Sequence, residues 1–108
     1  MAKTLEEYRT ILAKGLEEQE LLGDFDLDGL IDELSNFGST ELPEMKPGAR
    51  YVTAAIVSSE SGDTDLFLGQ GLLTARDIAV DSFLLSPTWW YGFENMNVYD
   101  VKHLEVGP

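Results

Sequence analysis

The chain has 108 residues, and 20 aspartates and glutamates against 7 lysines and arginines give it a formal net charge of −13 at pH 7. Negative charge of this density repels phosphate backbones and anionic lipid surfaces, which argues against direct binding to nucleic acids or membranes. The chain contains no cysteine, so disulfides, thiolate metal sites and cysteine nucleophiles are excluded. Its 44% of hydrophobic residues is typical of a folded globular protein. We expect one acidic domain over residues 1–108, without a signal peptide and located in the cytoplasm.

The first predicted element is a helix. Thr4 and Glu7 have the spacing of a capping box, in which each side chain pairs with a backbone amide at a helix start. Apolar residues then recur every three or four positions as far as about Leu22, and Gly23 suits the left-handed conformation that ends many helices. A helix over about 4–22 is therefore predicted.

A second, shorter helix is predicted after a tight turn. Its apolar residues share one face, Asp24 or Asp26 can cap its start, and Gly38 can end it. Together the two helices predict a hairpin over about 4–38. A linker that contains two prolines follows over residues 39–49.

The period of the apolar residues changes after the linker. Residues 50–58 are apolar on both faces, as in a buried strand, and residues 64–74 fit the returning strand. Residues 76–85 alternate weakly and fit either a third strand or a short helix, of which the strand is favoured. Residues 97–106 alternate again and predict the last strand, so the sheet part covers about 50–106.

This order of elements predicts an α+β fold. An N-terminal two-helix hairpin would pack on a three- to four-stranded, mainly antiparallel sheet.

Acidic residues are concentrated in the first part of the chain. Residues 1–45 carry 12 acids and 3 bases, whereas residues 46–108 carry 8 acids and 4 bases. Between residues 17 and 33 there are eight carboxylates and no lysine or arginine: Glu17, Glu18, Glu20, Asp24, Asp26, Asp28, Asp32 and Glu33. On a helical backbone these charges would be spaced on the order of 3 Å along the axis, close to the roughly 3.4 Å between phosphates of one DNA strand.

Three interpretations of this acidic tract are open. It can be a solvated helix face that keeps the protein soluble, or a feature of adaptation to high salt. It can also imitate a nucleic-acid backbone and occupy the basic cleft of another protein. The absence of interspersed lysines favours this third interpretation, because a face maintained for solubility gains stability from pairs of opposite charge.

Part of the tract resembles the calcium-binding loop of EF-hand proteins. Acids stand at loop positions 1, 3, 5 and 9 (Asp24, Asp26, Asp28 and Asp32), and Gly29 occupies the position of the sharp turn. At position 12, where the family has a bidentate glutamate, this chain has Ser35. A capped amphipathic helix is the competing interpretation, so these four acids are a weak candidate for a metal site.

Four large aromatic residues follow Pro87 in a short segment: Trp89, Trp90, Tyr91 and Phe93. Aromatic residues of this kind are frequent anchors of protein interfaces. A small core of helices and strands also needs bulky residues. We expect the cluster to pack mainly in the core with one tryptophan exposed, and Trp89 and Trp90 are the candidate partner contacts.

Catalysis is not expected of this chain. His103 is the only histidine, and without a cysteine or a second histidine it suits neither a zinc site nor a nucleophilic triad. General acid–base catalysis by carboxylates requires a cleft that separates their pKa values, and a hairpin of exposed acids provides none. We therefore predict a structural role for His103, no enzymatic activity and no cofactor.

These features predict a small inhibitor that binds a basic nucleic-acid-binding protein or nuclease through its acidic hairpin. In charge and size the chain is similar to anti-CRISPR and anti-restriction DNA mimics encoded by phages and mobile elements. An immunity or assembly protein whose acids serve one cognate partner is the alternative. A calcium-binding domain is the third hypothesis.

Overall fold

Helices occupy the start of the chain and interrupt the strands once near its end. The structure, a computed structural model, describes residues 3–38 and 41–107. Its elements in chain order are α1 (Leu5–Glu18), the 3-10 helix η1 (Leu22–Asp24), α2 (Leu27–Leu34), β1 (Tyr51–Ser59), β2 (Thr64–Gln70), α3 (Ala75–Leu85), α4 (Pro87–Trp90) and β3 (Met96–Glu105). No helix in the described parts of the chain is long and apolar enough to cross a membrane.

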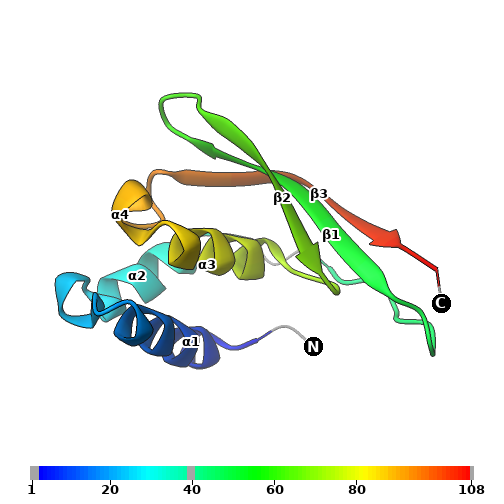
Figure 1. Cartoon of the computed structure of the whole chain (residues 1–108), viewed down its shortest axis with the longest axis horizontal. Coiled ribbons are helices and arrows are strands. Elements are labelled where there is room, and N and C mark those ends of the chain that lie inside the picture. The colour runs from blue at the N-terminus through cyan, green and yellow to red at the C-terminus, as the bar shows by residue number, and fades with distance from the viewer. Residues whose placement is uncertain (1–2, 39–40, 108) are drawn as a thin grey trace.

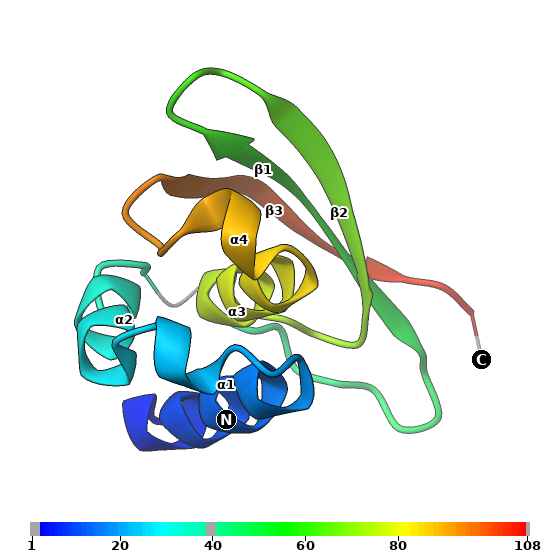
Figure 2. The same cartoon turned by 60° about the vertical axis from the view of Figure 1, so that its left-hand side comes forward.

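The elements form three layers, as Figures 1 and 2 show. The α1–α2 hairpin forms the first layer, α3 and α4 form the second, and the sheet forms the third. Helix α1 contacts both α2 and α3, and α3 in turn contacts β2 and β3. The sheet is antiparallel with the strand order β2-β1-β3. The predicted α+β fold, with contacting N-terminal helices and a three-stranded antiparallel sheet, is confirmed.

The linker has no regular secondary structure where it is described. Ser39 and Thr40, its first two residues, lie outside the described part of the chain. From Glu41 to the start of β1 the backbone contains no helix or strand. The three predicted strands are found within a few residues of their expected ends, although β2 stops at Gln70 rather than at residue 74.

Residues 75–85 form helix α3, so the strand favoured from the sequence is wrong. The helix is enclosed by the hairpin on one side and by the sheet on the other, and most of its side chains are buried. A helix buried on opposite sides has no single apolar stripe, so its sequence does not show a clear helical period. A capping box of Thr74 and Asp77 starts the helix, and this signal was present in the sequence.

Helix α1 begins at the predicted capping box but ends earlier than predicted. Thr4 and Glu7 make both capping-box hydrogen bonds, which confirms the predicted start. The helix ends at Glu18, and its end is closed by hydrogen bonds from the Leu21 amide to the Leu16 carbonyl and from the Glu20 amide to the Glu17 carbonyl. This pattern is a Schellman motif, so Gly23 does not have the predicted capping role.

Two groups of buried residues form the core, and α3 belongs to both. The larger group joins α1, α2, α3, α4 and the start of β3, and includes Tyr8, Leu12, Leu16, Leu34, Phe83 and Phe93. The smaller group lies between α3 and the sheet and consists of Ala55, Val57 and Ile78, with Phe67 and Leu73 packed against them. The hairpin therefore reaches the sheet mainly through α3.

A buried carboxylate joins α1 to α3. Asp77, only 8% exposed, accepts hydrogen bonds from the Lys3 ammonium and the Tyr8 hydroxyl, each at 2.9 Å. Its other oxygen accepts from the amide and hydroxyl of Thr74, each again at 2.9 Å. Burial alone would raise the pKa of Asp77, but the hydrogen bonds from Thr74, Lys3 and Tyr8 together lower it below its usual value. Burial, reinforced by the neighbouring Asp77 charge, raises the pKa of Tyr8 to about 12.

We expect Asp77→Asn to lower the free energy of unfolding by about 2 kcal/mol at neutral pH, because charge-assisted hydrogen bonds to a buried group are lost. The folded pKa of Asp77 lies below the unfolded one, so its contribution is present above the unfolded value of about 4 and is lost as the pH falls through the folded value. The stability difference between wild type and Asp77→Asn should therefore shrink at acidic pH. Urea unfolding at a series of pH values measures it.

Asp32→Asn is the matched control, because it removes the same charge from an exposed position on α2 where the carboxylate has no ion pair among the described residues. We expect it to change stability little. The role of Asp77 would be contradicted if the stability difference between wild type and Asp77→Asn did not vary with pH. An equal loss of stability in the control would also contradict it.

Candidate protein-interaction surface

The acidic tract lies on the outer side of the α1–α2 hairpin. Seven of its eight carboxylates belong to exposed residues: Glu17, Glu18, Glu20, Asp24, Asp26, Asp28 and Asp32. For the acids within α1 and α2 this follows from the helical period, because Leu12 and Leu16 of α1 and Leu30 and Leu34 of α2 face the core and turn the acids outward. Glu20, Asp24 and Asp26 lie in the connection between the two helices. Glu33 is half-buried.

Two of the eight carboxylates have partners among the described residues. Asp28 pairs with the Arg9 guanidinium at 3.1 Å, on an exposed part of the hairpin. Glu33 accepts a hydrogen bond of 2.7 Å from the Phe93 amide and so ties α2 to the segment before β3. The other six have neither an ion pair nor a side-chain hydrogen bond within residues 3–38 and 41–107. Their charge is available to a partner.

Glu20 is held in a backbone conformation that disfavours its side chain. Its φ of 60° lies in the left-handed region, at the position of the Schellman motif that is usually glycine. An L-residue in this conformation costs about 1–2 kcal/mol relative to ordinary helical backbone. The helix end therefore keeps a carboxylate where glycine would be more stable.

The two tryptophans have different environments. Trp90 is 4% exposed and belongs to the core, so it is not accessible for the partner contact that the sequence predicted. Trp89 is 53% exposed, and its ring lies edge-on to Trp90 with 4.3 Å between ring centroids. The short helix α4 produces this difference, because adjacent helical residues point in different directions. Of the two candidates, Trp89 remains accessible.

Apolar side chains are exposed beside the acidic tract. Leu85 is 80% exposed and Tyr91 is 76% exposed, and both flank the helix that carries Trp89. The Gln19 side chain at the end of α1 donates a hydrogen bond to the Leu84 carbonyl at the end of α3. This bond places the acidic helix end next to the exposed apolar residues, and Figure 1 shows α4 on the same side of the molecule as the turn between α1 and α2. Sequence reasoning missed Leu85, which lay in a segment interpreted as a strand.

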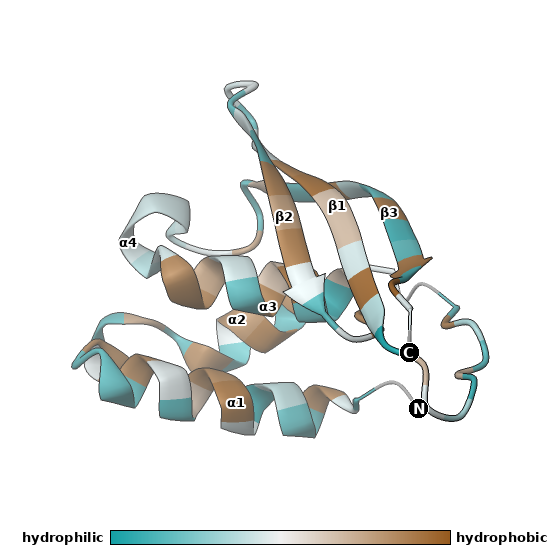
Figure 3. Cartoon of the chain, turned by 45° about the vertical axis from the view of Figure 1, so that its right-hand side comes forward, coloured by the Kyte–Doolittle hydropathy of each residue, from teal (hydrophilic) through white to brown (hydrophobic). Residues whose placement is uncertain are grey.

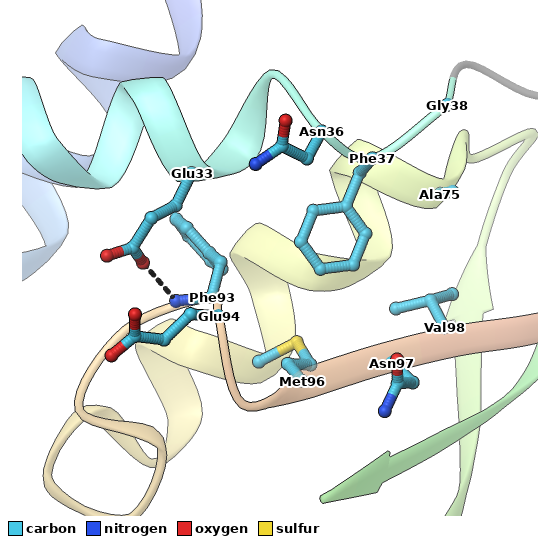
Figure 4. A pocket seen from close by; sticks show the side chains of 10 residues that line it. All are labelled: Glu33, Asn36, Phe37, Gly38, Ala75, Phe93, Glu94, Met96, Asn97 and Val98. Carbon is cyan, nitrogen blue, oxygen red and sulfur yellow. Dashed lines mark hydrogen bonds between the residues drawn. The ribbon is translucent and has the colours of Figure 1, made fainter. Parts of the chain in front are cut away.

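An open hollow of about 450 Å³ lies where α2, the start of α3 and the start of β3 meet. Phe37, Met96 and Val98 form its apolar part, and Figure 4 shows the carboxylates of Glu33 and Glu94 near each other at one end. Apolar walls with carboxylates at the rim can accept the stem and the charged head of a lysine or arginine side chain. Sequence reasoning missed this hollow, because it joins segments far apart in the chain.

The EF-hand-like segment does not form a calcium-binding loop. Helix α2 begins at Leu27, so Asp28 and Asp32 stand on a helix rather than in a loop. In the described parts of the chain, no three histidine, aspartate or glutamate side chains lie close enough together to hold a metal ion. His103 is half-buried, and its Nε2 atom lies 2.8 Å from the Leu73 carbonyl and donates a hydrogen bond to it.

No protein-family model, no curated protein sequence and no solved structure matches this chain. The surface combines carboxylates that have no partner among the described residues, an adjoining group of exposed apolar side chains and a hollow rimmed by acids. This combination suits the binding of a cationic protein surface. Arginine fits it best, because a guanidinium can pair with carboxylates and stack on an indole.

We expect Trp90→Ala to lower the free energy of unfolding by about 3–5 kcal/mol, because it leaves a large cavity in the core. Trp89→Ala should cost less than about 1 kcal/mol, because that side chain is half exposed. Urea unfolding of the two variants measures both effects. Equal losses would contradict the different environments of the two tryptophans.

Proposed function

We propose that the protein binds a basic nucleic-acid-binding protein and blocks it by presenting carboxylates in place of phosphates. The observation that carries this proposal is the set of six exposed carboxylates without a partner among the described residues. Repulsion among them destabilises the fold, so their retention without neutralising lysines favours a role outside the fold. A cationic groove would relieve this repulsion on binding.

The conformation of Glu20 supports a functional role for the tract. Backbone strain in native proteins is concentrated at functional positions, where the side chain is needed despite its cost. At the end of α1 glycine would satisfy the Schellman motif without strain. A carboxylate at this position is explained if a partner binds it.

The exposed apolar residues next to the tract support a protein partner rather than a diffuse counterion cloud. Interfaces combine a few aromatic anchors with a polar rim, and most of their binding energy comes from the anchors. Trp89 and Tyr91 provide such anchors beside the carboxylates. Charge would then accelerate the encounter, and the aromatic residues would slow dissociation.

The proposal is tested with the triple variant Glu17→Lys, Glu20→Lys, Asp24→Lys. Immobilised protein is incubated with heparin-binding proteins from the source cells, and bound proteins are identified by mass spectrometry. Wild type should retain a nucleic-acid-binding protein, with affinity falling about tenfold or more between low and physiological salt. The triple variant should retain none of it.

The matched control reverses three exposed acids outside the tract, with Glu41→Lys, Glu44→Lys and Asp65→Lys. It changes the net charge equally and should keep the partner. Equal loss in the control would show that only total charge matters. Unchanged binding by the triple variant would refute the role of the tract.

Competition with duplex DNA separates nucleic-acid mimicry from the alternative of an immunity or assembly protein. A mimic occupies the DNA site of its partner, so DNA should displace it. A protein that recognises its partner by shape at another place would stay bound. The latter result would exclude mimicry while leaving the acidic surface as the contact.

Glu20→Gly separates stability from binding at a single position. Glycine adopts the left-handed conformation without strain, so we expect the free energy of unfolding to rise by about 1 kcal/mol. Loss of the carboxylate should at the same time weaken partner binding. Thermal unfolding and the capture experiment measure the two effects, and stronger binding by this variant would contradict the proposal.

A further inference from the structure

The sheet has one face toward α3 and one face on which the described structure places no helix. Figure 1 shows the helices on one side of the sheet, and Figure 3 shows hydrophobic residues along the exposed strands. Ala55 and Val57 of β1 are buried on the helix side, and alternate residues point to the opposite side. The strand register defines three rows there, here termed the open face: Leu66, Ile56 and Tyr99; Leu68, Ala54 and Lys102; Gln70, Val52 and Leu104.

The open face is apolar where a solvated sheet is normally polar. Antiparallel sheets that face water carry mainly polar residues on that side. Here Leu66 and Leu68 are 59% and 65% exposed, and Tyr99 and Leu104 are also exposed. Apolar patches of this kind on an otherwise charged protein are typical of protein interfaces. We therefore expect a partner to cover this face.

The two ends of the open face carry opposite charges. The exposed Glu60 and Asp63 lie in the turn that follows β1, and the exposed Arg50 lies directly before β1. Arg50 and Glu60 are equally far from Ala55 along the chain, about 17 Å at 3.3 Å per residue. A copy of the same face turned end to end would thus bring an acid opposite the arginine at both ends.

We propose that the open face binds a second copy of this chain, sheet against sheet. The two-fold axis lies between the two sheets, perpendicular to the strands and at the level of Ala55. Each strand therefore lies over the same strand of the second copy, which runs in the reverse direction. Leu66 then lies over Leu68 of the second copy, and Arg50 lies opposite Glu60 of the second copy. The contact is isologous, so it closes as a dimer and does not propagate.

The same axis gives Lys102, the cation on the open face, an aromatic partner in the second copy. Ala54 pairs with Lys102 and Ile56 pairs with Tyr99 in the β1–β3 register. Reversing the direction places Tyr99 over Lys102 of the second copy, where the ring can bind the ammonium group. The two lysines are kept apart. A two-fold axis parallel to the strands would instead bring the acidic ends of the two open faces together.

The distribution of charge favours a second copy over a basic protein on this face. Lys102 lies on the face, and Arg50 at one end balances the acids at the other, so the face lacks the uniform negative charge that a basic partner requires. The acidic hairpin lies beyond α3 on the far side of the molecule. Packing the sheets together therefore keeps the two acidic hairpins apart, with little repulsion.

The size of the open face sets the expected strength of the dimer. Three strands about 4.8 Å apart and about 30 Å long give a face of roughly 400 Å² in plan. Stable dimers bury about 800 Å² on each partner, so the contact should be weak, with a dissociation constant of about 10–100 μM.

Sedimentation velocity over a range of about 1 μM to 1 mM tests the proposal, because it spans the expected dissociation constant. Wild type should change from monomer to dimer. The double variant Leu66→Glu, Leu68→Glu should raise the dissociation constant at least about tenfold, because it places charges in an apolar contact. Tyr91→Glu is the control, because Tyr91 is 76% exposed and follows α4 outside the open face, and this variant should dimerise like wild type. Circular dichroism verifies that each variant is folded.

A charge exchange tests the orientation of the two copies. Arg50→Glu and Glu60→Lys should each weaken the dimer about threefold or more, and the two together should restore it. A wild-type monomer throughout the concentration range would overturn the proposal. Dimerisation unaffected by the Leu66 and Leu68 substitutions would also overturn it. A combined variant weaker than both single variants would overturn the orientation.

Discussion

The carboxylate of Asp77 joins the first helix of the hairpin to α3, the helix on which the sheet packs. It caps the helix that contains it through Thr74, and it binds Lys3 and Tyr8 at the start of the chain. Its position next to Ile78, which packs against the sheet, means that one short segment of α3 fixes the hairpin and the sheet relative to each other. A buried charge is stable here because its hydrogen bonds replace those it had with water. The fold is thus organised around α3 rather than around a direct contact of hairpin and sheet.

The layered arrangement separates two surfaces of different chemistry. The hairpin presents unpaired carboxylates, and the far side of the sheet presents apolar side chains with Lys102 among them. With α3 between them, a cationic partner on one surface would not obstruct a second copy of the chain on the other. In the proposed dimer the two acidic hairpins would lie at opposite ends, so each could bind its own target. Such spacing would also limit the repulsion between two strongly acidic chains.

Several departures from local structural preference lie near the acidic end of the helices. Glu20 and Tyr91 are two of the three non-glycine residues with positive φ among the described residues, the third being Asp100 in β3, and Leu85 exposes most of its side chain. Each of these features reduces stability, and proteins tend to keep such features where function requires them. Their proximity to the exposed Trp89 is consistent with one contact area formed from α1, α3 and α4. The hydrogen bond between Gln19 and the Leu84 carbonyl fixes these parts relative to one another.

Local signals in the sequence determined the capping box at Thr4, the start of α1 and the three strands, because hydrogen bonding between near neighbours and the alternation of side chains act over a few residues. The outward position of the acids on α1 and α2 also followed from the helical period. For residues 75–85 the sequence signalled a helix only through the capping box at its start, since enclosure on two sides removes the usual pattern of one apolar face, and the tertiary structure decided the matter. It likewise decided that Trp90 is buried while Trp89 is accessible, and that no helix of the described residues covers one face of the sheet. These properties depend on which distant segments meet, and a single sequence read in order contains no direct signal for such contacts.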